Sequence, residues 1–151
     1  MFLALVLAAA IPVSQGDVTK QFTVKKPFET VANHVQNETD DLYHALGAEV
    51  LSRNGDEVTV AAETPMGRIQ FVQKEKITRT QDSVSLTLTS NSDTYKFYSK
   101  LVATPGGKRG TAITIEVRLS ISNEQATPAL IEMGINKVTN KIKKHLKTFG
   151  G

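Results

Sequence analysis

The residue best placed to do chemistry in this sequence is Glu75, which lies in a run with the pattern of a long strand, residues 68–79. Because successive side chains of a strand point to opposite faces, the apolar residues Phe71 and Ile77 mark the face that should be buried, and Gln73 and Glu75 share it. A carboxyl group enclosed by apolar side chains can act as a general acid or base, so Glu75 is the candidate catalytic residue. A bulge of one extra residue would instead turn Glu75 outward.

A second set of residues could line a cavity beside this strand. In the next strand, Tyr95, Phe97 and Ser99 alternate and should face inward. The Tyr95 hydroxyl could bind a ligand, although an inward tyrosine often places its oxygen at the sheet edge. The apolar stripe of the last helix would face the same space. The candidate cavity residues are therefore Phe71, Gln73, Glu75, Tyr95, Phe97, Ser99, Ile131, Ile135 and Val138.

The three histidines, His34, His44 and His145, do not have the spacing of metal ligands. His34 and His44 fall on two short helical segments, where they could flank the mouth of a cavity. The chain has no cysteine, which excludes disulfides, thiol nucleophiles and thiolate metal sites. It also has no Walker loop and no dinucleotide fingerprint. We therefore expect no metal site and no cofactor.

The net charge of +3 is concentrated at the end of the chain. Residues 124–151 hold five lysines and two glutamates, whereas basic and acidic residues balance over 1–123. Lys137, Lys141 and Lys144 could contact an anionic membrane or an acidic partner, or simply form a solvated helix face. Aromatic residues make up only 6% of the chain and do not alternate with basic ones, so we expect no nucleic-acid binding.

Residues 1–16 have features of a signal or targeting segment. An uncharged apolar run, 2–11, is too short to span a bilayer, which needs about 20 residues. Ser14 and Gly16 are small residues at the −3 and −1 positions of a cut before Asp17. No lysine or arginine precedes the run, and a buried N-terminal element is the alternative. We expect an exported protein, periplasmic or secreted, with a cytoplasmic location as the alternative.

The rest of the chain, 17–151, has the pattern of one α+β domain. Hairpin-length connections join the strands after the second helix, which predicts an antiparallel meander. A long amphipathic helix, capped by Thr127 and Pro128, closes the chain. The expected order is strand 18–25, helices 27–36 and 39–46, strands 48–53, 57–64, 68–79, 83–89, 94–103 and 111–122, and helix 128–149.

This order, over residues 17–149, resembles the START-like, or polyketide cyclase-like, helix-grip superfamily (SRPBCC type). The opening segments Phe22-Thr23-Val24 and Lys26-Pro27-Phe28-Glu29-Thr30-Val31 are similar to the first strand and first helix of that family. The resemblance implies a curved antiparallel sheet of about seven strands around the C-terminal helix. It also implies a cavity between them, which in most members holds a lipid, sterol, polyketide or other apolar ligand. A minority of members are cyclases, aromatases or hydrolases.

We therefore predict a binding or carrier domain for a hydrophobic small molecule or lipid, with possible peripheral contact to a membrane. The first alternative is a cyclase-, aromatase- or hydrolase-like enzyme that uses Glu75, Tyr95 or a histidine in the same cavity. The second alternative is a protein-interaction module with a filled core and no cavity. The sequence does not indicate the oligomeric state.

Overall fold

The computed structural model describes residues 14–64, 67–91, 95–121 and 128–150. The expected signal segment lies almost entirely outside these residues, as does the expected cap at Thr127. The first described strand begins at Ser14, so it starts three residues before the expected cut.

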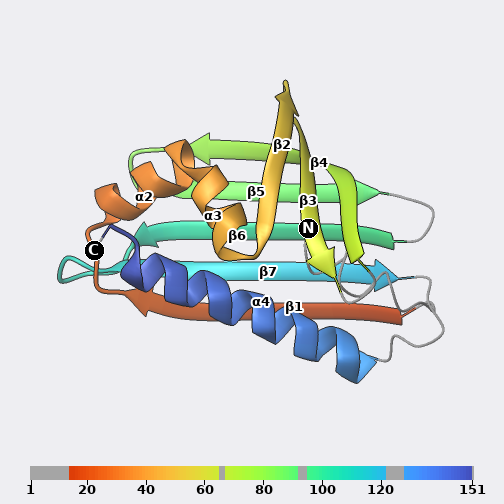
Figure 1. Ribbon diagram of the computed structural model, residues 1–151. Helices are drawn as coiled ribbons and strands as arrows, with labels where there is room; N and C mark the ends of the chain where they lie inside the picture. The colour runs from red at the N-terminus through yellow and green to blue at the C-terminus, as the bar shows by residue number, and fades with distance from the viewer. Residues whose placement is uncertain (1–13, 65–66, 92–94, 122–127, 151) are drawn as a thin grey trace.

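Seven antiparallel strands form one sheet in the described part of the chain, in the order β1-β7-β6-β5-β4-β3-β2. From β2 to β7 each strand pairs with its neighbour in sequence, which is the expected meander, and β1 closes the other edge by pairing with β7. In Figure 1, β2 and β3 run steeply across the direction of β5, β6 and β7, so the sheet is strongly curved. The strands are β1 (Ser14–Val24), β2 (Ala48–Asn54), β3 (Glu57–Thr64), β4 (Gly67–Arg79), β5 (Val84–Asn91), β6 (Tyr95–Pro105) and β7 (Thr111–Ile121).

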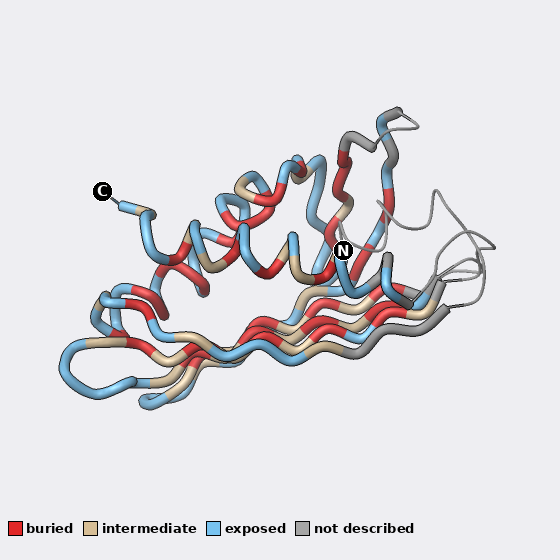
Figure 2. Tube along the Cα trace, turned by 90° about the horizontal axis from the view of Figure 1, so that it is seen from below, coloured by how far each residue is buried: buried red, intermediate tan, exposed pale blue. Residues whose placement is uncertain are grey.

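Among the described residues, three helices cover one face of this sheet (Figures 1 and 2). The short helices α2 (Phe28–Asn37) and α3 (Thr39–Ala45) connect β1 to β2. The long helix α4 (Pro128–Thr148) lies across β1 and β7. Buried positions recur in both layers, as expected for a two-layer α+β domain (Figure 2).

The core lies between the helices and the concave face of the sheet. Strands β5 and β7 contribute the inward residues that alternation predicts, and burial of each such side chain stabilises the fold by about 1.5–3 kcal/mol. From α4, Ile135 and Leu146 are fully buried. Leu146 belongs to the core cluster, so the buried stripe of α4 extends into the last turn of the helix.

The ends of the short helices differ from expectation in two places. Pro27 was expected as the first helical residue, but it occupies the N-cap position with an extended backbone, φ −58° and ψ 146°. Threonine is a favoured N-cap residue, which predicts Thr39 as the cap of the second short helix, but Glu38 takes that position and Thr39 is a buried helical residue. Gly47 follows α3 with φ +83°, a conformation that favours glycine, as expected for a helix end.

One β-bulge changes the face on which a charged residue lies. It falls in β2, between Val50 and Ser52. Val50 pairs with Val60, and after the extra residue Arg53 pairs with Val58. Both valines of β3 are buried, and directly opposed residues share a face of the sheet, so the bulge brings Arg53 to the concave side. The pairing of β4 is regular on both sides, so Gln73 and Glu75 keep the inward parity expected for them.

Candidate functional site

An apolar cavity of about 30 Å³ lies between α3, α4 and the middle of the sheet. Its volume is enough for roughly one or two water molecules. Leucine and isoleucine side chains form most of its wall, and Thr39, Tyr43 and Ser99 are the polar residues in it. The lining residues are Thr39, Leu42, Tyr43, Leu46, Leu86, Leu88, Ser99, Leu101, Ile115 and Ile142.

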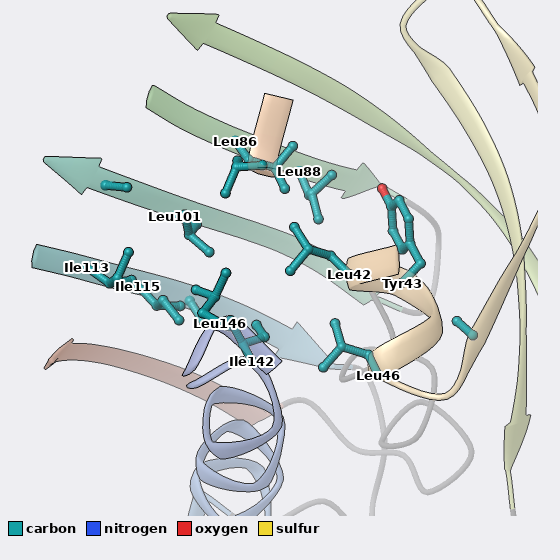
Figure 3. Close-up of a cluster of buried hydrophobic side chains, with 14 of the residues drawn as sticks. Leu42, Tyr43, Leu46, Leu86, Leu88, Leu101, Ile113, Ile115, Ile142 and Leu146 are labelled. Atoms are coloured by element: carbon teal, nitrogen blue, oxygen red, sulfur yellow. The ribbon is translucent and has the colours of Figure 1, made fainter. Parts of the chain in front are cut away.

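Helix α3 forms the wall of this cavity that lies opposite the sheet. Figure 3 shows Leu42 and Tyr43 of α3, and Leu46 at the C-cap of that helix, opposite Leu88 and Leu101 of the sheet. A helix of seven residues is too short to be stable alone, so its position depends on this packing. The wall is therefore held mainly by the leucines that also enclose the cavity.

A polar network lies at the sheet end of α3. The Tyr43 hydroxyl donates a hydrogen bond to Glu75 Oε2 at 2.8 Å, and Arg53 Nη1 donates to Glu75 Oε1 at 2.8 Å. Gln73 Nε2 donates to the Tyr43 oxygen at 2.7 Å. Because the single Tyr43 proton is directed to Glu75, the part of the Gln73 amide that faces Tyr43 must be its NH2 group. The side chain of Glu75 is only 8% exposed, so this carboxylate is buried and paired.

Arg53 extends the network to α3 itself. Its Nη2 atom donates to Thr39 Oγ1 at 2.9 Å and to Asp40 Oδ1 at 2.5 Å. One guanidinium group thus connects β2 and β4 to the first turn of α3. Its five donors in a fixed plane suit several acceptors at once, which a lysine could not match.

Two features of the network limit the chemistry that it can perform. Burial, together with the charge of Glu75, raises the pKa of Tyr43 well above its usual value. Tyr43 is therefore a neutral hydrogen-bond donor at physiological pH and a poor general base. Both oxygens of Glu75 accept hydrogen bonds from the protein, so proton transfer by Glu75 would require a substrate to displace Tyr43 or Arg53.

On the outer side of α3, an open polar groove of about 510 Å³ borders the same network. Arg53, Glu75 and Asp40 line it, and Thr39 lines both the groove and the apolar cavity. The Gln73 oxygen Oε1, in contrast, is buried and has no hydrogen-bond partner among the described residues. A further hydrogen-bond donor could satisfy this oxygen.

The cavity residues predicted from the sequence lie in different parts of the structure. Of the seven whose side chains the structure describes, Ser99 is the one that lines the apolar cavity. Phe71, Phe97 and Ile135 are buried in the core, and Val138 is half-buried beside it. Gln73 and Glu75 belong to the polar network. The side chains of Tyr95 and Ile131 lie outside the described part of the structure.

Sequence reasoning missed the residues of α3, because α3 was not considered as a wall. A signal was present, since Leu42 and Leu46 are four residues apart and share one helix face. Likewise, His34 forms a contact with His145 of α4, whereas His44 is exposed on α3. That contact joins positions 111 residues apart, which no local pattern indicates.

Lys137, Lys141 and Lys144 are exposed on α4, away from its buried stripe. Among the described helices, none combines the length and apolar character that crossing a bilayer requires.

No family model matches the sequence, and no curated protein matches it significantly. Solved structures do match the fold. A START superfamily protein from Mycobacterium smegmatis superposes with a TM-score of 0.63 at 15% identity, over 87% of this chain and 94% of that one. A human lipid transfer and protein localization domain gives 0.60 at 13% identity, over 87% and 75%. An aromatase/cyclase from a Streptomyces species gives 0.59 at 11% identity, over 91% and 99%.

At these identities the matches establish architecture. They agree with the strand order, the two short helices after β1 and the long C-terminal helix. The chain therefore has the START-like helix-grip fold that its order of elements predicted.

Proposed function

We propose that this domain binds a hydrophobic small molecule or lipid between α3, α4 and the sheet, and acts as a carrier. The observation that carries the proposal is the apolar cavity under α3. Its wall is almost entirely leucine and isoleucine, with the hydroxyl-bearing residues Thr39, Tyr43 and Ser99 to orient a polar end. Apolar walls with a few polar groups are typical of small-molecule sites.

The size of the cavity sets a condition on binding. Ligand sites commonly measure about 300–1,000 Å³, about tenfold or more above the volume found here. A ligand must therefore displace part of the wall. Helix α3 is the element suited to this, because it is short and because Leu42 and Leu46 contribute both to the cavity wall and to the core.

The structural matches support the class of ligand. One similar structure is described as a lipid transfer domain and another as an aromatase/cyclase. These descriptions concern those proteins, and the shared fold is the reason to test apolar ligands on this one.

The proposal also includes a place of action. The apolar run at 2–11 supports export, and the exposed lysines of α4 support contact with anionic lipid. A carrier that docks on a membrane surface through α4 would bring the adjacent cavity close to the lipid from which it loads.

The direct test is native mass spectrometry of the full chain purified without detergent, followed by organic extraction. We expect a stoichiometric hydrophobic adduct on the wild type. Leu101→Phe, which fills the cavity, should lose the adduct, whereas Val72→Phe adds the same ring at a position 51% exposed and should keep it. If no adduct appears and no fluorescent fatty acid binds saturably, the carrier function is wrong.

An enzyme of the cyclase or hydrolase type is the second candidate, and the groove beside Glu75, Arg53 and Asp40 favours it. It predicts turnover of an ester or polyketide-type substrate. Glu75→Gln should abolish that turnover, and Glu49→Gln, which changes an exposed glutamate, should not. A clean apo mass without turnover would leave the interaction module with a filled core.

A further inference from the structure

Two histidines from distant parts of the chain face each other at one end of the helical layer. His34 of α2 and His145 of α4 approach with their Nε2 atoms 2.8 Å apart. His34 is 4% exposed and stacks on Phe149, with ring centroids 3.8 Å apart. His145 is half-buried. The pair is therefore held by packing on one side and open to solvent on the other.

Two carboxylates complete the cluster. Glu38 Oε2 lies 2.5 Å from His34 Nδ1. Ligand-type atoms of His34, Glu38 and Asp41 lie within 4.8 Å of one another. Asp41 stands in the first turn of α3, and its charge acts on His145 across the gap between α3 and α4. Three helices thus bring two imidazoles and two carboxylates into one small volume.

The hydrogen bonding fixes which nitrogen atoms are available. His34 Nδ1 donates its proton to Glu38, so in the neutral ring the lone pair of His34 is on Nε2. That lone pair points at Nε2 of His145. A proton on His145 Nε2 makes this contact an ordinary N–H···N hydrogen bond, and a metal bound between the two rings would take the place of that proton. A carboxylate that holds the far nitrogen of a histidine is the usual support for a metal-binding ring.

Burial, followed by the neighbouring His34, lowers the pKa of His145 below its ordinary value. Metal binding requires the neutral form of each imidazole, because a ring nitrogen must supply a lone pair to the ion. Glu38 and Asp41 are exposed and supply negative charge around the pair, which would offset the charge of a divalent ion.

We propose that His34 Nε2, His145 Nε2 and the Asp41 carboxylate bind a divalent transition metal of the Zn²⁺ type, with Glu38 orienting the His34 ring. Two nitrogens on a tetrahedral zinc lie about 3.3 Å apart, from Zn–N bonds of about 2.0–2.1 Å. The two nitrogens therefore have to separate by about 0.5 Å from their present 2.8 Å, and the rings have to turn so that both lone pairs point to one ion beside the line between them. Imidazole ligands favour zinc, copper or nickel over magnesium and calcium.

The metal would connect α4 to α2 and α3. Ile142 lies one helical turn before His145, and Leu42 lies next to Asp41, and both apolar residues line the cavity under α3. A bound ion would hold that wall in place. The metal site does not depend on the proposed carrier function, and its test does not involve a hydrophobic ligand.

The test uses the full chain, stripped with a chelator and then titrated with Zn²⁺ in competition with a chromogenic indicator. We expect one equivalent to bind. His145→Gln should abolish this binding, and Asp41→Asn should weaken it. Glu38→Gln should weaken it by about 10–100-fold. His44→Gln is the matched control, because His44 is an exposed histidine on α3 outside the cluster, and it should bind as the wild type does.

A second readout identifies the ligands. Co²⁺ in place of Zn²⁺ should give the visible absorption of a tetrahedral ion in the wild type and in His44→Gln, and none in His145→Gln. Because His145 is half-buried, its replacement should leave the circular dichroism spectrum unchanged, which separates loss of a ligand from unfolding. Absence of stoichiometric binding to the wild type, or equal binding by His145→Gln, would overturn the proposal and leave a proton-bridged histidine pair.

Discussion

The hydroxyl of Tyr43 and the carboxylate of Glu75 form a hydrogen bond of 2.8 Å that lies between two different spaces. Tyr43 lines the apolar cavity, and Glu75 lines the polar groove on the other side of α3. The pair therefore divides an apolar interior from a charged exterior. Arg53 holds the outer member of the pair, so the barrier between the two spaces depends on one guanidinium group.

Replacing Tyr43 with phenylalanine should destabilise the fold by about 1–3 kcal/mol. The change removes the donor to Glu75 and the acceptor for Gln73 Nε2, and Gln73 is 1% exposed, so its amide cannot turn to solvent. Urea denaturation measures the effect. Tyr98→Phe alters a half-buried tyrosine of β6 and should change stability by less than about 0.5 kcal/mol. Equal effects of the two substitutions would show that the network contributes nothing.

The raised pKa of Tyr43 predicts a loss of stability at alkaline pH. The folded state prefers the neutral phenol, whereas the unfolded chain ionises near pH 10. The stability that Tyr43 contributes is therefore full below pH 10 and is lost as the pH rises above it. Denaturation at pH 8 and pH 10.5 should show this fall in the wild type and less of it in Tyr43→Phe.

A spectroscopic measurement provides the control for that prediction. Phenolate absorbance should develop equally in the wild type and in Tyr43→Phe until the chain unfolds, because Tyr43 stays neutral in the folded state. An additional reversible phenolate in the folded wild type would show that Tyr43 ionises normally.

Enlarging the apolar cavity should weaken the fold and increase its uptake of apolar molecules. Leu86 is 6% exposed and lines the cavity, so Leu86→Ala should cost about 2–5 kcal/mol of stability. Binding of a fluorescent fatty acid should become tighter in the same variant. Val72→Ala, at an exposed site, should change neither quantity. Unchanged or weaker uptake by Leu86→Ala would contradict the location of the site.

Charge reversal on α4 should reduce binding to anionic vesicles. Lys137→Glu, Lys141→Glu and Lys144→Glu together should weaken binding to vesicles that contain phosphatidylserine by about a hundredfold or more, from about 1 kcal/mol per lysine. The matched control reverses Lys74, Lys76 and Lys96, which are equally exposed but lie on strands. Sedimentation at two salt concentrations measures both sets. If the two triple variants behave alike, net charge rather than α4 determines membrane contact.

The sequence predicted the sheet well because the patterns that define a sheet lie in short, continuous stretches of the chain. Alternation in β5 and β7 and the short connections between strands determine which residues face inward and which strands are neighbours. The inward parity of Glu75 followed from the same rule, because β4 has no bulge in its described pairing.

The partners of Glu75 could not be predicted in this way. Arg53 reaches it because a bulge between Val50 and Ser52 changes the face of β2, and no residue type marks that position. Tyr43 reaches Glu75 because α3 packs on the sheet with one particular rotation about its own axis. Several other rotations of the helix would also bury leucine side chains. The contact of His34 with His145 depends in turn on how α4 crosses α2. Long-range packing determines each of these relationships.

The pairing of β1 with β7 has a consequence for how the chain folds. Val24 lies opposite Thr111, so the first strand finds its partner only when the last strand has been made. Contacts between such distant segments slow folding, because the loop must close before the contacts can stabilise it. On the ribosome, the meander β2–β7 can form stepwise, while β1 has no strand partner until β7 has been made. The N-terminal strand thus completes the sheet last, although it is synthesised first.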